Sequence, residues 1–518
     1  MRTLGDIPKR YARLTPRKEA LVFEDTRLTW KAFNDRINCL ANWLLAKGAK
    51  KGDTVSALAE NCNQYYELYY AAFKIGLIPA PVNYRLAPPE MLHLINFSEA
   101  RVLFVGAEYF EFVEKNRDQM PFVATRVSFD GPRPGMEDYE ALLAQSSSGE
   151  PRIEVDENEV ALISFTGGTT GRPKGAMLTH RNFTSVMRTI LISGDMNGND
   201  ITLQVLPPFH LTIWQTLIAH YIGAKSVLNK KLDLHHVMAQ FSKEKVTHIN
   251  LVPVILNWIV NDPDFGQYDF SSLRYITYGG SPIPAAVLEK CIQKLKPRFF
   301  QGFGLTESTL LATVLGAEYH VLSDDPIAKQ RLNSVGQEAL HNEVKVVDEN
   351  GNELPAGEVG EIIIHGPNVM KGYWKDPEQT ADRIRKGWLY SNDLGYFDAD
   401  RFLYIVDRKQ FMIITGGENV YPKEVEDVLY RHPGVSEAAV VSAPDAKWGE
   451  TVVAVIVPRP GVELKEAEVI AFTRERLAGY KCPRTVKFVA ALPKTPIMKI
   501  DHLKVREPFW KGHDRRVT

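Results

Sequence analysis

The chain has 518 residues, enough for two to four domains with several hydrophobic cores. Its 62 basic residues nearly cancel its 63 acidic ones, which argues against nucleic acid or an anionic membrane surface as a partner. The cysteines are far apart and form no CxxC pair, which argues against a disulfide framework or a clustered zinc site and fits a reducing compartment. They are Cys39, Cys62, Cys291 and Cys482.

The sequence predicts neither a secretory signal nor a membrane span. Residues 1–14 alternate charged and apolar side chains and lack a continuous apolar region. The most apolar stretch, residues 65–82, is interrupted by Glu67, Lys74 and two prolines. We therefore expect a cytoplasmic enzyme.

Residues 30–47 predict an amphipathic helix, with Thr29 as the N-cap and Gly48 as the stop. Short apolar runs follow, such as residues 102–105 and 160–165, and they alternate with helical stretches such as residues 284–294. This alternation favours α/β layers over a helical bundle or an all-β chain. The polar residues 146–151 predict a linker or a surface loop.

The pattern changes from about residue 343. Val344 and Val346 alternate with polar residues, Asn350-Gly351 predicts a hairpin turn, and residues 359–364 return as a strand. We expect a β-rich subdomain over about residues 335–406.

A compact unit follows this subdomain. Its expected elements are a helix at 422–431, strands at 438–442 and 452–457, and a helix at 465–478. We therefore divide the chain into an N-terminal domain (1–406), a hinge (407–411) and a C-terminal domain (412–518).

A loop rich in glycine and threonine leaves the apolar run at 160–165. Glycines let backbone N–H groups approach an anion, threonine hydroxyls add donors, and Lys174 adds a positive charge. Because Arg172 and Pro173 separate glycine from lysine, this is not a Walker loop, and a plain flexible turn is the alternative. The residues predicted to bind polyphosphate are Thr166, Gly167, Gly168, Thr169, Thr170, Gly171 and Lys174.

This loop closely resembles the signature loop of the acyl-adenylate-forming superfamily, which includes acyl-CoA synthetases, peptide-synthetase adenylation domains and firefly luciferases. The resemblance covers nearly the whole chain, in the family's order. It implies an α/β fold with a large multi-subdomain N-terminal domain and a small, mobile α+β C-terminal lid. It also implies ATP, Mg2+ and CoA as cofactor and co-substrates.

Two further segments resemble parts of the family's nucleotide site. Gly279-Gly280-Ser281 resembles the adenine-contacting segment. Residues 302–307 resemble the family's aromatic-Gly-x-Thr-Glu motif and supply Gly302, Phe303, Gly304, Thr306 and Glu307. In this motif the ring offers a face for adenine, the threonine a hydroxyl for phosphate, and Glu307 a carboxylate for Mg2+. Phenylalanine replaces the more usual tyrosine.

Asp393 and Arg408 resemble the family's ribose-binding residues, although the chain has Ser-Asn-Asp where Thr-Gly-Asp is more usual. Gln410 occupies the hinge position, usually aspartate or lysine. Lys499 resembles the adenylation lysine, whose ammonium bridges the attacking carboxylate and the α-phosphate. Met498 precedes it where the family usually has glycine.

His210 resembles the histidine or aromatic residue between the acyl pocket and the CoA tunnel, and a packed core histidine is the alternative. The resemblance places CoA beside a glycine segment and several exposed side chains of the C-terminal domain. These residues are Gly416, Gly417, Glu418, Trp448, Tyr480, Lys481 and Arg484.

The resemblance implies an AMP-forming carboxylic acid–CoA ligase that acts on small-molecule acids, ATP and CoA. An adenylating enzyme that loads a carrier-protein thiol and a non-catalytic adenylate-binding regulator are the alternatives. The oligomeric state is open, with a homodimer as one expectation.

The resemblance also implies which segments line the acyl pocket, and in this chain those segments are apolar. They supply no cation for a second carboxylate and no aspartate for an amino group, so we expect a neutral acid with a fatty or aromatic tail. Tyr278 and Trp214 are expected either to stack on a ring or to be core residues. The predicted lining residues are Leu211, Ile213, Trp214, Val252, Val254, Ile255, Tyr278, Leu310 and Leu311.

Overall fold

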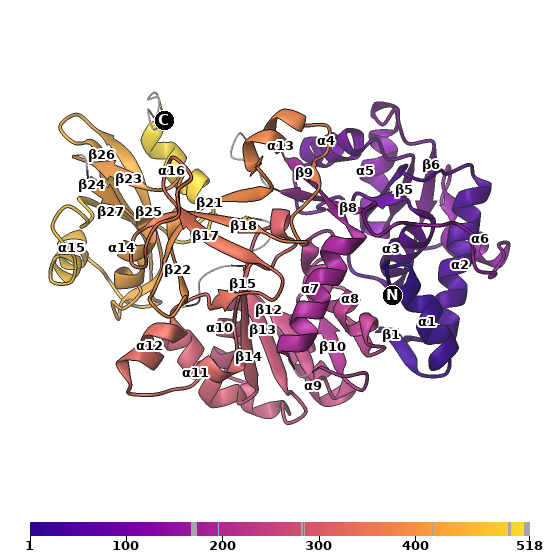
Figure 1. Cartoon of the computed structure of the whole chain (residues 1–518), viewed down its shortest axis with the longest axis horizontal. Coiled ribbons are helices and arrows are strands. Elements are labelled where there is room, and N and C mark those ends of the chain that lie inside the picture. The colour runs from indigo at the N-terminus through magenta and orange to yellow at the C-terminus, as the bar shows by residue number, and fades with distance from the viewer. Residues whose placement is uncertain are drawn as a thin grey trace.

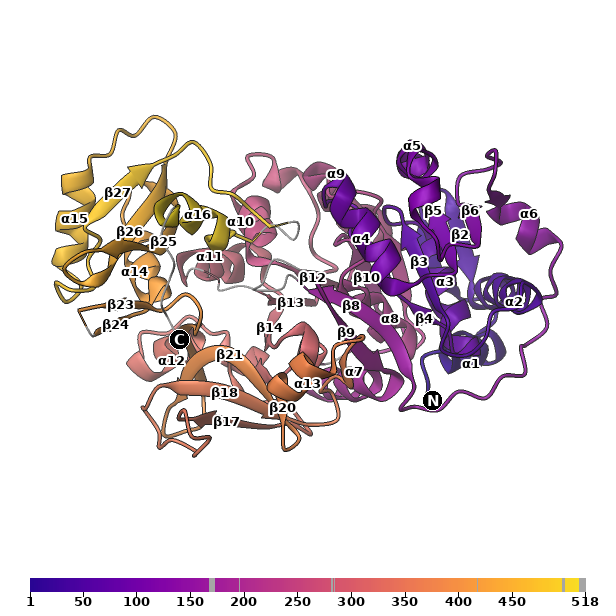
Figure 2. The ribbon, with the colours of Figure 1, turned by 90° about the horizontal axis from the view of Figure 1, so that it is seen from above.

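The computed structural model describes residues 1–166, 173–194, 196–280, 283, 285–416, 418–495 and 499–511. Figures 1 and 2 show the N-terminal elements at one end of the molecule and the C-terminal elements at the other, with the largest sheet between them. Within these described ranges, every helix is too short or too polar to cross a bilayer.

The largest sheet has nine strands, and its inner strands are parallel with antiparallel strands at both edges. Its order is β16 (Gln337–Glu338), β15 (Thr313–Leu315), β14 (Arg298–Phe303), β13 (Tyr275–Gly279), β12 (His248–Leu251), β10 (Ile201–Gln204), β11 (Lys225–Leu228), β1 (Glu19–Phe23) and β2 (Thr26–Thr29).

A second, all-parallel sheet contains β4 (Ile78–Pro79), β3 (Thr54–Leu58), β5 (Val102–Val105), β6 (Thr125–Ser128) and β7 (Glu137–Asp138). The helices of the N-terminal half are α1 (Asp6–Leu14), α2 (Trp30–Ala46), α3 (Asn63–Ile75), α4 (Pro88–Ser98), α5 (Phe110–Lys115), α6 (Tyr139–Ala144), α7 (His180–Ser193) and α8 (Trp214–Tyr221). Buried side chains of α1–α3, α7 and α8 share one large hydrophobic core.

The opposite face of the nine-stranded sheet is covered by α9 (Leu234–Glu244), α10 (Pro253–Asn261) and α11 (Ala285–Leu295). Leu203, Ile249 and Phe299 of the sheet pack against these helices in a second core. A sheet covered on both faces explains why its strands read as short apolar runs.

Two smaller antiparallel sheets complete the N-terminal part. One contains β19 (Gly372–Tyr373), β9 (Lys174–Thr179) and β8 (Val160–Thr166). The other contains β17 (Glu343–Val347), β18 (Gly360–His365), β21 (Trp388–Phe397), β20 (Ile384–Arg385) and β22 (Leu403–Arg408). Helix α12 (Pro326–Leu332) lies between β15 and β16 in sequence, and helix α13 (Pro377–Arg383) lies between β19 and β20.

The residues after β22 form a unit with its own hydrophobic core, which includes Ile413, Val440, Ile456 and Val469. Its strands are β24 (Glu418–Val420), β23 (Ile413–Thr415), β26 (Gly449–Pro458), β25 (Val435–Asp445) and β27 (Thr485–Phe488). Its helices are α14 (Pro422–Leu429), α15 (Glu466–Arg474) and α16 (His502–Trp510).

Several sequence predictions are confirmed by these elements. The helix predicted at 30–47 is α2, and the Thr29 hydroxyl accepts a hydrogen bond from the Ala32 N–H group at 3.2 Å, as an N-cap does. The predicted hairpin joins β17 and β18, with Gly351 at a φ of 85°. The helix predicted at 465–478 is shorter, because α15 ends at Arg474.

The polar stretch at 146–151 is a surface loop fixed to α2 and α3. The Asn42 amide donates to the carbonyls of Ser147 and Gly149, at 2.7 and 2.8 Å. Glu150 forms a 2.8 Å ion pair with the buried Lys74. The carbonyls of this loop therefore satisfy donors on the helices.

Candidate active site

The phosphate loop is held at both ends by an antiparallel pair of strands. Thr166 at the end of β8 pairs with Lys174 at the start of β9. The Lys174 ammonium lies 5.2 Å from the centre of the Tyr373 ring on the neighbouring β19. Five of the predicted phosphate-binding residues, Gly167, Gly168, Thr169, Thr170 and Gly171, lie outside the described residues.

Glu307 is a buried carboxylate in a short 3-10 turn (η5, Thr306–Ser308). The Tyr373 hydroxyl donates a 2.7 Å hydrogen bond to its Oε1 atom. Burial and the Glu307 charge raise the pKa of Tyr373, so the phenol remains a donor. Tyr373 therefore links the predicted metal ligand Glu307 to the phosphate-loop lysine Lys174.

The chain from Phe303 to Ala312 is a tightly closed turn. A Cβ on Gly304 would lie 2.5 Å from the backbone of Leu310, so glycine is needed there. Thr309 and Leu310 both have positive φ, 51° and 69°. The Ala312 N–H group donates to the Phe303 carbonyl at 2.6 Å, which closes the turn that presents Thr306 and Glu307.

Gly279 and Gly302 lie opposite each other on the parallel strands β13 and β14. A Cβ on Gly279 would lie 2.4 Å from the Gly302 carbonyl oxygen, so only glycine allows this approach. Gly280 follows with a φ of 80°, which favours glycine. Ser281 lies outside the described residues.

Asp393 and Arg408 are cross-strand partners on β21 and β22, and Arg408 Nε lies 3.3 Å from Asp393 Oδ1. Burial raises the pKa of Asp393, while Arg408, Arg383 and Lys499 oppose that rise. Asn392 has a φ of 61°, a conformation that asparagine tolerates. Asparagine can therefore replace the family's glycine in Ser-Asn-Asp.

Lys499 comes from the C-terminal unit and enters the same site. The Thr495 N–H group donates to the Lys499 carbonyl at 2.7 Å, and Lys494 forms an antiparallel bridge with Ile500. The Cε and Nζ atoms of Lys499 lie 3.8 Å from the position that a Cβ would take on Gly280. Burial and the Arg408 charge lower the pKa of Lys499 to about 8, against the opposing effect of Asp393.

His210 lies between β10 and α8, immediately before a 3-10 turn (η3, Leu211–Ile213). Burial, with the Lys499 charge adding to it, lowers the pKa of His210 to about 4, so the ring is neutral near pH 7. Its Nδ1 atom is buried without a hydrogen-bond partner in the described part of the chain. His210 and Lys499 therefore belong to one site with Gly280, Asp393 and Arg408.

The predicted CoA residues form two groups in the C-terminal unit. A Cβ on Gly416 would lie 2.7 Å from the Trp448 ring, and the Arg484 guanidinium lies 4.8 Å from the centre of that ring. Lys481 is paired with Glu424 at 2.7 Å, next to the half-exposed Tyr480. Glu418 is exposed on β24, and Gly417 lies outside the described residues.

The predicted hinge contacts α16 and adjoins a contact between the two units. Arg506 Nη1 donates to the Gln410 carbonyl at 3.4 Å, and His502 stacks on Phe411 with ring centres 5.3 Å apart. Asp407 Oδ2 accepts a 3.0 Å hydrogen bond from the Lys423 N–H group at the start of α14. Burial raises the pKa of Asp407 to about 6.

Of the residues predicted to line the acyl pocket, some are buried in the core and others are only partly buried. Tyr278 is a core residue that packs against Phe299 and His320, and its hydroxyl lies 2.9 Å from His320 Nε2. It is therefore held by the protein and does not offer a free face to a substrate ring. Leu211, Ile213, Ile255 and Leu311 are buried, whereas Trp214, Val252, Val254 and Leu310 are only partly buried.

Two polar residues of this site were missed by the sequence interpretation, Tyr373 and Arg383. Tyr373 follows Gly372 and precedes Trp374, and an aromatic run beside a glycine was the available signal. Arg383 is the last residue of α13, and nothing in its sequence context distinguishes it from a surface arginine.

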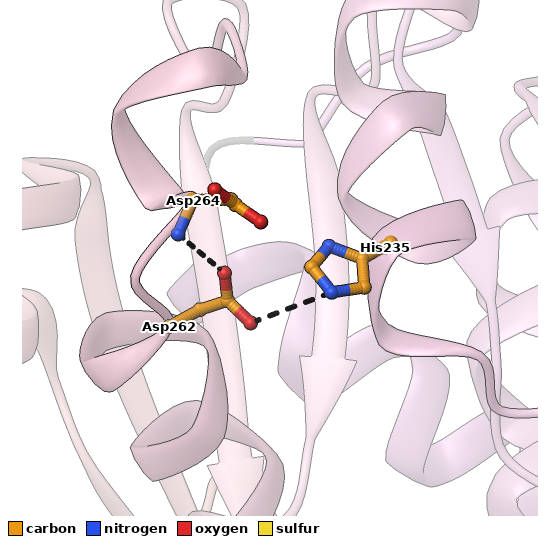
Figure 3. Close-up of side chains that lie close together, drawn as sticks. All are labelled: His235, Asp262 and Asp264. Atoms are coloured by element: carbon orange, nitrogen blue, oxygen red, sulfur yellow. Dashed lines mark hydrogen bonds and ion pairs between the residues drawn. The ribbon is translucent and has the colours of Figure 1, made fainter.

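Another group of potential metal ligands lies on α9 and beyond the end of α10 (Figure 3). The ligand atoms of His235, Asp262 and Asp264 lie within 4.8 Å of one another. His235 Nδ1 lies 3.0 Å from the Tyr268 hydroxyl, and Asp262 accepts from the Asp264 N–H group at 2.8 Å. These local turn contacts account for the arrangement, so we assign no metal to it.

The chain matches the AMP-binding enzyme family over residues 8–374 and the AMP-binding enzyme C-terminal domain over residues 424–499. It is 36% identical to a feruloyl-CoA synthase of Amycolatopsis sp, covering 98% of this chain and 99% of that protein. It is 33% identical to a fatty acid–[acyl-carrier-protein] ligase, ScoC, of Streptomyces coeruleorubidus, covering 100% of this chain and 98% of that protein.

A solved structure of the anthranilate CoA ligase AuaEII in complex with anthranoyl-AMP has a similar fold. It superposes with a TM-score of 0.89 at 25% sequence identity, covering 98% of this chain and 97% of that one. Since the two family models and these relatives cover almost the whole chain, it belongs to the AMP-binding enzyme family, in its acyl-CoA synthetase branch.

Proposed function

We propose that this AMP-forming acid–CoA ligase acts on a neutral carboxylic acid with an aromatic or aliphatic tail. In the first half-reaction the acid and ATP form acyl-AMP and pyrophosphate. In the second, CoA takes the acyl group and AMP leaves. The observation that carries the adenylation step is the position of Lys499, a lysine of the C-terminal unit beside Gly280, Asp393 and Arg408.

Adenylation joins two anions, so the site must reduce their repulsion. The carboxylate oxygen attacks the α-phosphorus, and the electron pair of the breaking P–O bond leaves with pyrophosphate. A protonated Lys499 stabilises the negative charge where these two anions meet. Asp393 and Arg408 orient the ribose, and Lys174 with the phosphate loop holds the polyphosphate. The neutral His210 adds no charge of its own near the acyl group.

The residues present fit a magnesium ion. Glu307 offers a buried carboxylate of which Oε1 is held by Tyr373, and carboxylate and phosphate oxygens are the ligands that Mg2+ prefers. When bound there, Mg2+ would neutralise charge on the ATP phosphates. The contribution of the chain is to fix the orientation of that carboxylate.

The second half-reaction requires the lysine to leave the site. We propose that residues 412–518 rotate about the hinge at 407–411, with Gln410 as the pivot. The separate core of the C-terminal unit supports this, because such a unit can move as one body. Rotation would withdraw Lys499 and bring the segment at 416–418 towards the acyl-AMP, with Trp448, Tyr480, Lys481 and Arg484 available to the CoA nucleotide.

The choice of acid rests on the lining and on the relatives. The predicted lining supplies apolar side chains and no charge, and a buried charge without a partner costs several kcal/mol. The relatives are named for ferulate, anthranilate and fatty acids, which share an apolar or aromatic body. Each buried methylene adds about 0.8 kcal/mol, so acetate should be a poor substrate.

The test is acid-dependent ATP–pyrophosphate exchange, followed by AMP release with CoA. Benzoate, ferulate, octanoate, acetate, succinate and an amino acid are compared by kcat/KM under identical conditions. We expect benzoate, ferulate or octanoate to exceed the other three by at least about tenfold, the effect of roughly two buried methylenes. A preference for succinate, acetate or the amino acid would refute the prediction that an apolar pocket binds the acyl tail.

A second candidate is transfer of the acyl group to a carrier-protein thiol, favoured by the similarity to the fatty acid–[acyl-carrier-protein] ligase. Both acceptors carry a pantetheine thiol, so the adenylation step is the same. Preformed acyl-AMP offered to CoA and to a pantetheinylated carrier protein separates them. Faster transfer to CoA supports the ligase assignment, and transfer to the carrier protein alone overturns it.

A further inference from the structure

An unusual arginine lies between the ribose site and the phosphate site. Arg383 ends α13, and its Nη2 atom donates to the Ser391 carbonyl at 3.1 Å, two residues before Asp393. Its Nη1 atom is buried and has no hydrogen-bond partner in the described part of the chain. A buried donor of a permanently charged group is costly when nothing pairs with it.

The neighbours of Arg383 locate it within the active site. Burial raises the pKa of Asp393 and of Tyr373, and the nearby Arg383 charge opposes both rises. The Arg383 guanidinium also contacts the Tyr373 hydroxyl. The Tyr373 hydroxyl bonds Glu307, and the Tyr373 ring lies 5.2 Å from the Lys174 ammonium. Arg383 is therefore on the side of the site that holds the phosphate-loop lysine and the predicted metal ligand.

The opposite side of the site already contains two positively charged side chains, those of Lys499 and Arg408. Lys499 lies beside Gly280, and Lys499 and Arg408 both contribute to the electrostatics of Asp393. Those groups serve the reacting carboxylate, the α-phosphate and the ribose in the proposed function. An additional guanidinium beside Tyr373 is placed for the rest of the polyphosphate, and its planar fork matches phosphate oxygens.

We propose that Arg383 is a substrate-binding residue whose free Nη1 side binds the β,γ-phosphates of ATP and the pyrophosphate that leaves. This inference rests on the proposed adenylation reaction. As the carboxylate oxygen bonds to the α-phosphorus, the α,β-bridging oxygen keeps the electron pair and leaves on pyrophosphate. Arg383 stabilises the negative charge that grows on that leaving group.

The experiment compares ligands that differ only in the outer phosphates. Binding of ATP, AMP and pyrophosphate is measured by calorimetry without the acid, on the full-length chain. The variants are Arg383→Gln and Arg383→Lys, with Arg385→Gln as the matched control. Arg385 is two residues further on, exposed, paired with Asp382 at 2.9 Å and placed over the Tyr390 ring.

We expect Arg383→Gln to weaken ATP and pyrophosphate binding by about tenfold or more, as loss of a charged hydrogen bond does. AMP binding should change less than about twofold, because AMP lacks the outer phosphates. Arg383→Lys should recover part of the loss, since it keeps the charge without the fork. Arg385→Gln should match the wild type for all three ligands.

Equal weakening of ATP and AMP overturns the proposal, because it places the contact on their common part. The proposal is also overturned if Arg383→Gln binds ATP as tightly as the control Arg385→Gln does. Should Arg383→Gln fail to fold by thermal melting, the ATP-to-AMP affinity ratio of Arg383→Lys decides, and a wild-type ratio overturns the proposal. Acid-dependent ATP–pyrophosphate exchange by the wild-type enzyme tests the proposed adenylation reaction separately. A failure of that reaction can therefore be distinguished from a failure of the role proposed for Arg383.

Discussion

The N-terminal and C-terminal sides of the active site are held in different ways. On the N-terminal side, Glu307 and Asp393 are buried and each is paired with a residue of a neighbouring segment, Tyr373 and Arg408. Gly279 and Gly302 also bring two strands into close contact. On the C-terminal side, Lys499 reaches the site from a unit with a separate core.

This difference has a chemical consequence. In the proposed function, Asp393, Arg408 and Glu307 bind the nucleotide and its metal ion in both half-reactions, and they lie on packed strands and turns. In the same proposal, the charge of Lys499 acts only while the carboxylate attacks phosphorus, and Lys499 belongs to the unit that we propose to move. The arrangement therefore separates binding from the step-specific charge, and each side should respond to mutation in its own way.

The largest effect is expected from Lys499→Ala. Loss of this ammonium should slow acyl-AMP formation by about 10²–10³, the usual cost of one preorganised electrostatic group. Transfer of the acyl group from supplied acyl-AMP to CoA should remain near the wild-type rate. Stopped-flow measurement of each half-reaction checks this, and equal losses in both would show that the lysine does not act in one step alone.

A comparable effect on a single half-reaction is expected from Gln410→Pro. Proline fixes φ near about −65°, so a pivot at this residue could no longer change its conformation. One half-reaction should survive and the other should be lost. Gln410→Ala is the control and should retain both. If both single-step rates of the proline variant match the control, the pivot lies elsewhere.

The contrast between the two sides was only partly predictable from the sequence. Local signals worked where one segment decides the structure: Thr29 caps α2, and Asn350-Gly351 turns between β17 and β18. The motifs around Lys174, Glu307 and Asp393 predict a nucleotide site because each of these segments carries its characteristic residues close together in sequence.

The long-range contacts of the site were not predictable in this way. Tyr373 reaches Glu307 across 66 residues of sequence, through the pairing of β19 with β9. Arg383 faces the site only because α13 ends beside β21, where Ser391 accepts its hydrogen bond. Tyr278 could have faced either side of its strand, and only the packing with Phe299 and His320 shows that it lies in the core.

Tyr373→Phe should have the next largest effect, on the N-terminal side. The variant keeps the ring beside Lys174 but leaves Glu307 Oε1 without its donor. A hydrogen bond to a charged group contributes about 1.5–3 kcal/mol, so we expect the magnesium concentration for half-maximal exchange to rise about tenfold.

The matched control for that variant is Tyr396→Phe. Tyr396 stacks on Tyr404 in the five-stranded antiparallel sheet, whereas Tyr373 is on β19 of the three-stranded sheet. High magnesium should restore the exchange rate of Tyr373→Phe. A lower maximal rate with an unchanged magnesium requirement would show that Tyr373 does not act through Glu307.

The pH dependence of adenylation should follow the protonation state of Lys499, the residue that the C-terminal unit contributes to the site. Lys499 has its pKa lowered to about 8, so its active, charged form is lost as pH rises through that value. At low substrate, exchange should fall by about fivefold between pH 8 and pH 9, and by about tenfold for each further pH unit, because the charged fraction is about one half at the pKa. Bound phosphates favour the ammonium, so the fall should shift to higher pH at saturation.

Lys499→Arg provides the control, because its guanidinium stays charged and its residual activity should not fall above pH 8. His210 is already neutral above about pH 4 and should add no acidic limb near pH 6.5. An unchanged alkaline limb in Lys499→Arg would assign the titration to another group.

The smallest effect is expected from Arg484→Ala, at the proposed CoA contact. Arg484 lies over the Trp448 ring and 4.0 Å from Asp445, in a partly exposed position. Exposed contacts of this kind contribute about 0.2–1 kcal/mol, so the KM for CoA should rise only about two- to fivefold. ATP–pyrophosphate exchange should be unaffected, because adenylation does not use this surface in the proposed cycle. Initial rates at varied CoA, with acid and ATP saturating, measure the first quantity, and exchange without CoA measures the second. A fall in exchange with an unchanged KM for CoA would place Arg484 on the adenylation side and remove the proposed division between the two units.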